Sequence, residues 1–194
     1  MWPPLRLCPS SALCPSLCDT CPMNGKHLGA LVSAIGGLAF VLLNAGSLPS
    51  VWPWLLRGLG VLAFAWALLR LTRPGTFPSG RRPDARSWRM YMLSVGLMVL
   101  AFPLGARALS LSGHVEYILS WVVLVVGLHF FPFASAFSAP IFRSVAAGLV
   151  AAALLGVGLT ALGLPWGPAA GAVAAGFILL AYSGGLGQSK SLPL

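Results

Sequence analysis

Long apolar runs separated by short polar segments dominate the hydrophobic pattern of this chain. Six of these runs are long enough for a helix to cross a bilayer, which takes about twenty residues. We expect spans at about 28–48, 51–71, 90–110, 115–137, 141–164 and 166–186. Because backbone groups inside lipid have to hydrogen-bond within their own segment, these runs predict an all-α, polytopic membrane helical bundle of about six transmembrane helices.

The composition supports a membrane bundle and excludes an ordinary soluble fold. Hydrophobic residues make up 58% of the 194 residues and charged residues 8%, and the mean hydropathy is +0.89. A soluble domain has roughly 25% charged residues, which form its polar surface. This chain cannot supply such a surface, whereas a protein embedded in lipid does not need one.

A basic segment, 72–89, separates the second run from the third. Together with Arg70 just before it, the segment contains six arginines and a single acidic residue, Asp84. The arginines are Arg70, Arg73, Arg81, Arg82, Arg86 and Arg89. Basic segments between spans stay on the cytoplasmic side, so we expect a cytoplasmic loop here. Counting six spans from this loop, we expect both chain ends on the cytoplasmic side as well. We expect its arginines to set the topology and to contact anionic lipid headgroups.

The net charge of +9 raises the question of nucleic-acid binding. That function needs basic residues on a folded polar face, whereas most of these lie between hydrophobic spans. We therefore expect no nucleic-acid partner. Arginine strongly outnumbers lysine amid abundant alanine, glycine and leucine, which is typical of a GC-rich genome and favours a bacterial inner (cytoplasmic) membrane.

All four cysteines lie in the first 21 residues, with the spacing C-x5-C-x3-C-x2-C. Structural zinc sites usually have two pairs of ligands, each pair closely spaced and the two pairs far apart in the sequence. We therefore expect no metal site here, although a cytosolic redox or metal cluster is an alternative. Prolines interrupt the segment, which argues against a signal peptide. We expect residues 1–22 to be a disordered tail or an over-extended gene start before Met23. The membrane domain would then cover 23–188, followed by a tail at 189–194.

Polar side chains inside apolar runs are costly in lipid, so each is a candidate functional residue. His129 lies deepest in its run, and one interpretation is a proton-titrating or ligand-contacting imidazole. The alternative is a structural hydrogen bond to a neighbouring helix carbonyl that a proline has left free. Pro132, three residues later, also predicts that the fourth helix bends or ends there.

Arg57, Arg107 and Glu116 are expected near the outer face of the membrane. One interpretation is a structural Arg107–Glu116 pair that closes the third and fourth helices. The other is an outward-facing polar vestibule in which Arg57 or Arg107 receives an anionic group of a substrate.

No catalytic motif accompanies these residues. The sequence contains neither His-Glu-x-x-His nor a Walker-type loop nor a dinucleotide fingerprint, and it lacks a pair of intramembrane aspartates. Ser183 precedes two glycines, as a nucleophilic serine can, but no histidine accompanies it in the nearby spans. We therefore expect no enzyme activity and no cofactor.

Small residues recur at helical spacing in several spans. Gly29, Ser33 and the Gly36–Gly37 pair mark one side of the first span, alanine and glycine dominate the fifth, and the sixth contains Gly-x3-Gly and Ala-x3-Gly. Small residues at this spacing let helix backbones approach closely. They are candidate contacts for a homodimer or for a partner membrane protein.

The stretch GLHFFPFA, from Gly127 to Ala134, resembles a segment of a group of small bacterial multi-spanning membrane proteins. In those proteins the segment closes a helix before a short cytoplasmic turn. The resemblance implies a membrane location and assigns no activity.

Two functions are consistent with these features. One is a small transporter or permease-like protein that moves a small solute through a bundle lined by His129 and the arginines. The other is a non-enzymatic structural or partner subunit that assembles through its Gly/Ala-rich helix faces. A continuous polar cavity reaching His129 would favour the transporter.

Overall fold

The computed structural model describes residues 25–72, 85–136 and 141–186. These residues form six α-helices: α1 (Gly25–Asn44), α2 (Trp52–Leu71), α3 (Ala85–Leu111), α4 (Ile118–Ala136), α5 (Ile141–Ala161) and α6 (Gly167–Ser183). Two short 3-10 turns, η1 (Ala45–Ser47) and η2 (Val115–Tyr117), follow α1 and precede α4. The predicted all-α bundle is confirmed.

Some sequence predictions concern residues outside these ranges. They are the expectations for residues 1–22 and their cysteines, for the tail at 189–194, and for Arg73, Arg81 and Arg82 in the basic segment.

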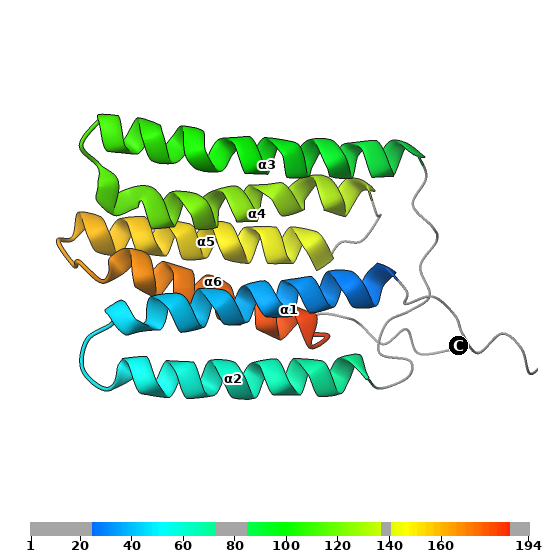
Figure 1. Ribbon diagram of the computed structural model, residues 1–194, viewed down its shortest axis with the longest axis horizontal. Helices are drawn as coiled ribbons and strands as arrows, with labels where there is room; N and C mark the ends of the chain where they lie inside the picture. Colours follow the sequence, from blue (N-terminus) through cyan, green and yellow to red (C-terminus); the bar gives the residue numbers. More distant parts are fainter. Residues whose placement is uncertain (1–24, 73–84, 137–140, 187–194) are drawn as a thin grey trace, which may run out of the picture.

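The helices lie side by side in an order that differs from their order along the chain (Figure 1). From one edge of the bundle to the other, the order is α3, α4, α5, α6, α1, α2. The helix α6 is central and packs against α5, α1, α2 and α4, whereas α3 packs chiefly against α4. Consecutive helices α2 and α3 therefore lie at opposite edges.

We call the end of the bundle where α2 ends and α3 begins the basic end. At this end α1 begins, α4 gives way to α5, and α6 ends (Figure 1). The other end, which contains η1, η2 and the α5–α6 turn, is called the far end. Because the described helices alternate in direction, the start of α1 and the end of α6 lie at the same end of the bundle.

Among the described residues, five helices are long and apolar enough to cross a membrane, which fits a multi-pass membrane protein. They are α1 to α5, and α6 is apolar but has only 17 residues. Such a helix is about 25 Å long, slightly less than the roughly 30 Å of the hydrocarbon core. It is shorter than the expected span 166–186 because Pro168 lies in its first turn and Gly185, with φ of 91°, follows its end.

The helix α4 continues through Pro132 to Ala136, close to the end of the expected span 115–137, but another boundary differs from the expected one. The helix α3 begins at Ala85, so Arg86 and Arg89 belong to its first turns rather than to a loop. Helical structure depends on backbone hydrogen bonds and not on hydropathy, so a helix can begin before its apolar run does.

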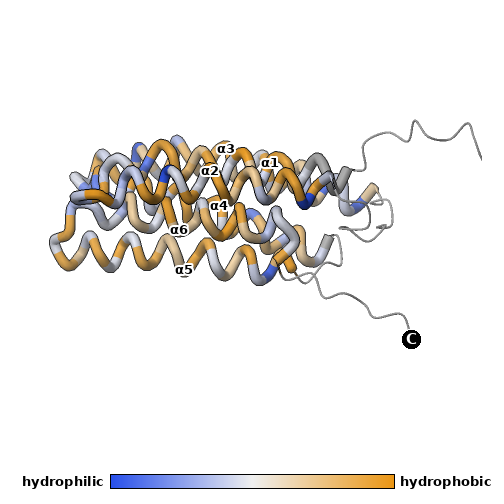
Figure 2. The backbone as a smooth tube through the Cα atoms, turned by 90° about the horizontal axis from the view of Figure 1, so that it is seen from below, coloured by the Kyte–Doolittle hydropathy of each residue, from blue (hydrophilic) through white to orange (hydrophobic). Residues whose placement is uncertain are grey.

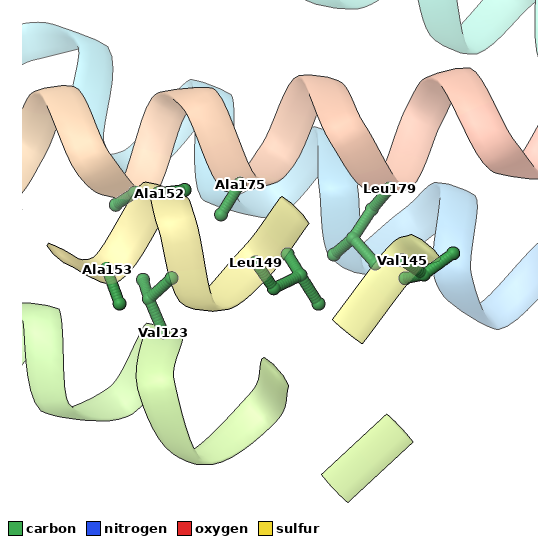
Figure 3. Close-up of a cluster of buried hydrophobic side chains, with 8 residues drawn as sticks. Val123, Val145, Leu149, Ala152, Ala153, Ala175 and Leu179 are labelled. Atoms are coloured by element: carbon green, nitrogen blue, oxygen red, sulfur yellow. The ribbon is translucent and has the colours of Figure 1, made fainter. Parts of the chain in front are cut away.

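Small side chains form the core where α4, α5 and α6 meet. Figure 3 shows this cluster, in which the labelled residues are Val123, Val145, Leu149, Ala152, Ala153, Ala175 and Leu179. A second cluster, of Ala34, Val41, Ala67 and Leu180, joins α1 and α2 to α6. Helices that meet through alanine and valine approach closely, which increases the van der Waals contact that holds membrane bundles together.

Glycines lie at the points of closest approach. A Cβ atom on Gly171 of α6 would lie 2.6 Å from the carbonyl oxygen of Ala152 on α5. Gly37 of α1 and Gly176 of α6 form a reciprocal pair, in which a Cβ on either would lie 2.7 or 2.6 Å from the carbonyl oxygen of the other. The small-residue faces of these helices therefore pack against one another within the chain.

A substitution at Gly156 tests the contact between α4 and α5. The Cβ of Gly156→Ala would lie 2.7 Å from Ser120 Oγ and 3.4 Å from the carbonyl oxygen of Gly167. We expect a loss of about 1–3 kcal/mol in the free energy of unfolding, the usual cost of overpacking. Denaturant unfolding of the purified protein in detergent micelles measures it.

Gly158→Ala, on the same helix, is the matched control, because nothing in the described structure lies within 4 Å of its added Cβ. Combining Gly156→Ala with Ser120→Ala should recover part of the loss, since the hydroxyl is the closest obstacle. Equal stability of the Gly156→Ala and Gly158→Ala variants would contradict the observed packing.

Candidate functional site

The most hydrophilic residues lie mainly toward the two ends of the bundle, and the middle of the helices is predominantly hydrophobic (Figure 2). The basic end carries Arg70, Arg86, Arg89 and Arg143, all of them exposed. Arg70 also has a packing role, because its guanidinium lies 5.2 Å from the centre of the Trp66 ring.

His129 lies on α4, about 10 Å before the end of the helix, and faces α3. Its Nδ1 atom is 2.9 Å from Ser94 Oγ, and that hydroxyl also lies 3.2 Å from the carbonyl oxygen of His129. Ser94 is buried and His129 is partly buried. The partner of His129 is therefore a side-chain hydroxyl, and not a carbonyl left free by a proline as the structural alternative expected.

Sequence reasoning missed Ser94. The signal available was its position, because it is the one serine or threonine between Trp88 and Ser110 in an apolar run. A small polar side chain in such a run has to find a partner on another helix or on its own backbone. The hydrogen-bond partner of Ser94, His129, is 35 positions away in the sequence, and no local pattern can reveal a contact at that distance.

Aromatic rings surround the His129–Ser94 contact. Phe133 approaches the imidazole edge-to-face at 4.5 Å between ring centres, and Phe130 does so at 5.6 Å. Tyr91 on α3 lies 5.2 Å from Phe133. Phe142 on α5 stacks on Phe130 at 6.2 Å. Edge-to-face and offset arrangements of this kind are favourable and fix the orientation of the rings.

A second contact joins α3 to α4 nearer the far end. The indole Nε1 of Trp121 donates a hydrogen bond of 2.9 Å to the carbonyl oxygen of Ala101. The ring lies so close to Gly105 that any side chain there would overlap it. Pro103, between these two positions, lies inside α3 and cannot donate a backbone hydrogen bond. The tryptophan therefore joins α3 to α4 next to a residue of α3 that cannot donate a backbone hydrogen bond.

Arg57 joins the first two helices. Its Nε donates a hydrogen bond of 3.3 Å to the carbonyl oxygen of Leu42, in the last turn of α1, where carbonyl groups have no partner within the helix. Its guanidinium carbon lies 5.9 Å from the Trp54 ring centre, and a Cβ on Gly46 would lie 2.8 Å from its Nη2. The positive charge also interacts favourably with the negative end of the α1 dipole.

Glu116 pairs with a different residue from the one expected. Its Oε1 lies 3.3 Å from Nδ1 of His114, and the two side chains are 44% and 60% exposed. Arg107 is exposed on α3, and within the described residues it forms no ion pair with Glu116. Exposed pairs contribute little to stability, so this turn depends mainly on its backbone contacts.

The four candidate polar residues do not come together. His129 lies toward the basic end of α4, and Glu116 lies at the far end. Arg57 is on α2 and Arg107 is on α3, which lie at opposite edges of the bundle (Figure 1). A single vestibule that contains both arginines is therefore not formed by these helices.

Two apolar grooves indent the described bundle. One, of about 240 Å³, lies between α3, α4 and α5 and is lined by Leu109, Trp121 and Leu154 among others. The other, of about 540 Å³, lies between the α1–α2 hairpin and α6, beside Trp52, Trp166 and Phe177. His129, Arg57, Arg107 and Glu116 line neither groove. These grooves therefore do not provide a polar path to His129.

Within the described residues no three His, Cys, Asp or Glu side chains are placed to hold a metal ion. Three hydrogen bonds in the described structure join one helix to the next, at Ser94–His129, Trp121–Ala101 and Arg57–Leu42. Comparisons with protein-family models, curated proteins and solved structures gave no significant match, so functional inference depends on this geometry.

Proposed function

We propose that the protein is a non-enzymatic structural or partner subunit of a membrane assembly. One observation carries the proposal: Arg57, Ser94 and Trp121 use their polar groups to join one helix to the next, and the two grooves described above are apolar. Solute sites in transporters are usually lined by convergent polar groups near the middle of the membrane. A membrane-embedded protein with an apolar interior is better suited to binding another protein than to moving a polar solute.

The partner contact would lie on helix faces directed at lipid. The Gly/Ala-rich faces expected to serve this role pack largely within the chain, as Gly37, Gly171 and Gly176 show. The edge helices α2 and α3 bury only 11% and 6% of their apolar windows against the rest of the bundle. These two helices therefore offer the largest uncovered surface to a second copy or to another membrane protein.

We also propose a bacterial cytoplasmic membrane as the location, with the basic end in the cytoplasm. The exposed arginines at that end support this orientation. Anionic lipid headgroups are the expected lipid partners of these arginines, at roughly 1 kcal/mol for each basic residue near the surface.

Photo-crosslinking in native membranes tests the partner proposal. A photoreactive phenylalanine derivative is placed at Leu62 on α2 or at Leu97 on α3, which are 68% and 59% exposed. We expect at least one position to give a discrete protein adduct, identified by mass spectrometry. Leu154 on α5, 60% exposed, is the matched control on another helix. Lipid adducts alone at all three positions would contradict the proposal.

A small-solute permease is the second candidate, and the partial burial of His129 favours it, because part of the imidazole stays accessible. Proteoliposomes loaded with the pH-sensitive dye pyranine measure proton movement under an imposed gradient. The structural proposal predicts the same slow leak for the wild-type protein and for His129→Gln. A flux in the wild type that His129→Gln abolishes would establish transport and overturn the structural role.

A further inference from the structure

The hydroxyl of Ser94 has one proton but two close partners on His129. Its Oγ lies 3.2 Å from the carbonyl oxygen of His129 and 2.9 Å from Nδ1 of the same residue. A carbonyl oxygen can only accept a hydrogen bond, so both contacts are hydrogen bonds only when the proton of Ser94 points toward that oxygen. The remaining contact is then a bond in which Nδ1–H donates to Ser94 Oγ.

We infer that Ser94 is a positioning residue that holds the neutral imidazole of His129 in the tautomer protonated on Nδ1. In this arrangement Nε2 carries a lone pair and acts as a hydrogen-bond acceptor. In the opposite tautomer, the Ser94 hydroxyl would donate its hydrogen bond to Nδ1 and no longer to the carbonyl oxygen. This tautomer would also turn Nε2 into an N–H donor, for which the described residues provide no hydrogen-bond partner.

The surroundings of the imidazole leave Ser94 as the group that decides the tautomer. From α3 the ring is approached by Ser94 and by Tyr91, whose ring lies against Phe133. Phe142 of α5 packs against the same aromatic cluster, and the residue after it in the chain, Arg143, is exposed. The described residues contain one carboxylate, Glu116, and it lies at the far end of α4, about 20 Å away. No carboxylate of the described helices therefore competes for the Nδ1 proton.

This assignment gives His129 a binding property beyond its role in joining two helices. The Nε2 lone pair can accept a hydrogen bond from a hydroxyl or amine group, or it can take a proton. Both contacts with Ser94 survive such a change, because Nδ1 remains a donor in the imidazolium form. The α3–α4 contact therefore tolerates a ligand or a proton at Nε2 without breaking.

Nitrogen-15 NMR of histidine-labelled protein in lipid nanodiscs tests the assignment, at a pH where the imidazole is neutral. The chain has three histidines, and the spectrum of His129→Gln identifies the signals of His129 by their loss. Long-range proton–nitrogen correlations then report which ring nitrogen carries the proton. We expect Nδ1–H in the wild type and a shift to Nε2–H in Ser94→Ala. Ser94→Thr, which keeps the hydroxyl, should retain Nδ1–H.

Ser110→Ala is the control on the same helix, because the Ser110 hydroxyl donates to the carbonyl oxygen of Ala106 within α3 at 2.8 Å. It should leave the His129 signals unchanged. An Nε2–H tautomer in the wild type would overturn the inference. So would retention of Nδ1–H in Ser94→Ala. The wild-type spectrum tests the tautomer even if a variant does not fold.

Discussion

Gly37→Ala is expected to lower the free energy of unfolding by about 1–3 kcal/mol, the typical cost of overpacking a tight contact. The added Cβ would lie 2.7 Å from the carbonyl oxygen of Gly176, 3.0 Å from Leu179 Cβ and 3.1 Å from Leu180 Cγ. Two of these three atoms belong to backbone or to the base of a side chain, so they cannot move aside without moving α6. Because α6 is the central helix, a displacement there affects its contacts with α1, α2 and α5.

Gly36→Ala provides a matched control one residue away. Nothing in the described structure lies within 4 Å of a Cβ at Gly36. In a helix exposed to water, alanine is favoured over glycine by about 1 kcal/mol, so this variant should be as stable as the wild type or slightly more stable. Both variants are unfolded with denaturant in the same micelles and compared by circular dichroism. If the two behave alike, α1 and α6 do not cross at Gly37 and Gly176.

Gly105→Ala is expected to have the second large effect, by detaching α3 from α4. The indole of Trp121 occupies the space next to Gly105, so a methyl group would displace the ring. The displaced ring would also lose its hydrogen bond to Ala101, which adds about 0.5–1.5 kcal/mol to an overpacking cost of about 1–3 kcal/mol. The same change at Gly96 of α3, where nothing described lies within 4 Å, should have little effect.

A double-mutant cycle identifies the cause of the Gly105→Ala effect. In a Trp121→Ala background there is no ring to displace, so Gly105→Ala should then cost little or nothing. Unfolding free energies of the two single variants and the double variant give the coupling energy between the positions. Additive effects would show that Gly105 and Trp121 do not interact in the folded protein.

The helical architecture was predictable because bilayer thickness imposes a length on every spanning helix. Six apolar runs led directly to six helices among the described residues, and the basic segment correctly separated the second from the third. Helix ends were less predictable. The start of α3 at Ala85 depends on local backbone bonding that hydropathy does not report.

The candidate site was predictable only in part. His129 stands out in the sequence because it interrupts an apolar run, and the structure gives it a specific partner. Its partner, Ser94, also interrupts an apolar run, but nothing near it in the sequence indicates which helix it contacts, and the same holds for Trp121, which joins the same two helices. Arg57 was a candidate to receive an anionic group of a substrate, and the structure shows it donating a hydrogen bond to the end of α1. Long-range pairing decides such roles, and residue type alone does not.

Hydrophobicity along the chain is sufficient to determine that this protein contains several membrane-length helices and a basic segment between two of them. It does not determine which face of each helix meets which neighbour. Gly29, Gly36 and Gly37 look equivalent in the sequence, yet only Gly37 touches another helix closely. Likewise, α2 and α3 follow each other in the chain but lie at opposite edges of the bundle (Figure 1). Both results have one physical reason: lipid solvates any apolar face, so only close packing between particular helix surfaces selects their arrangement.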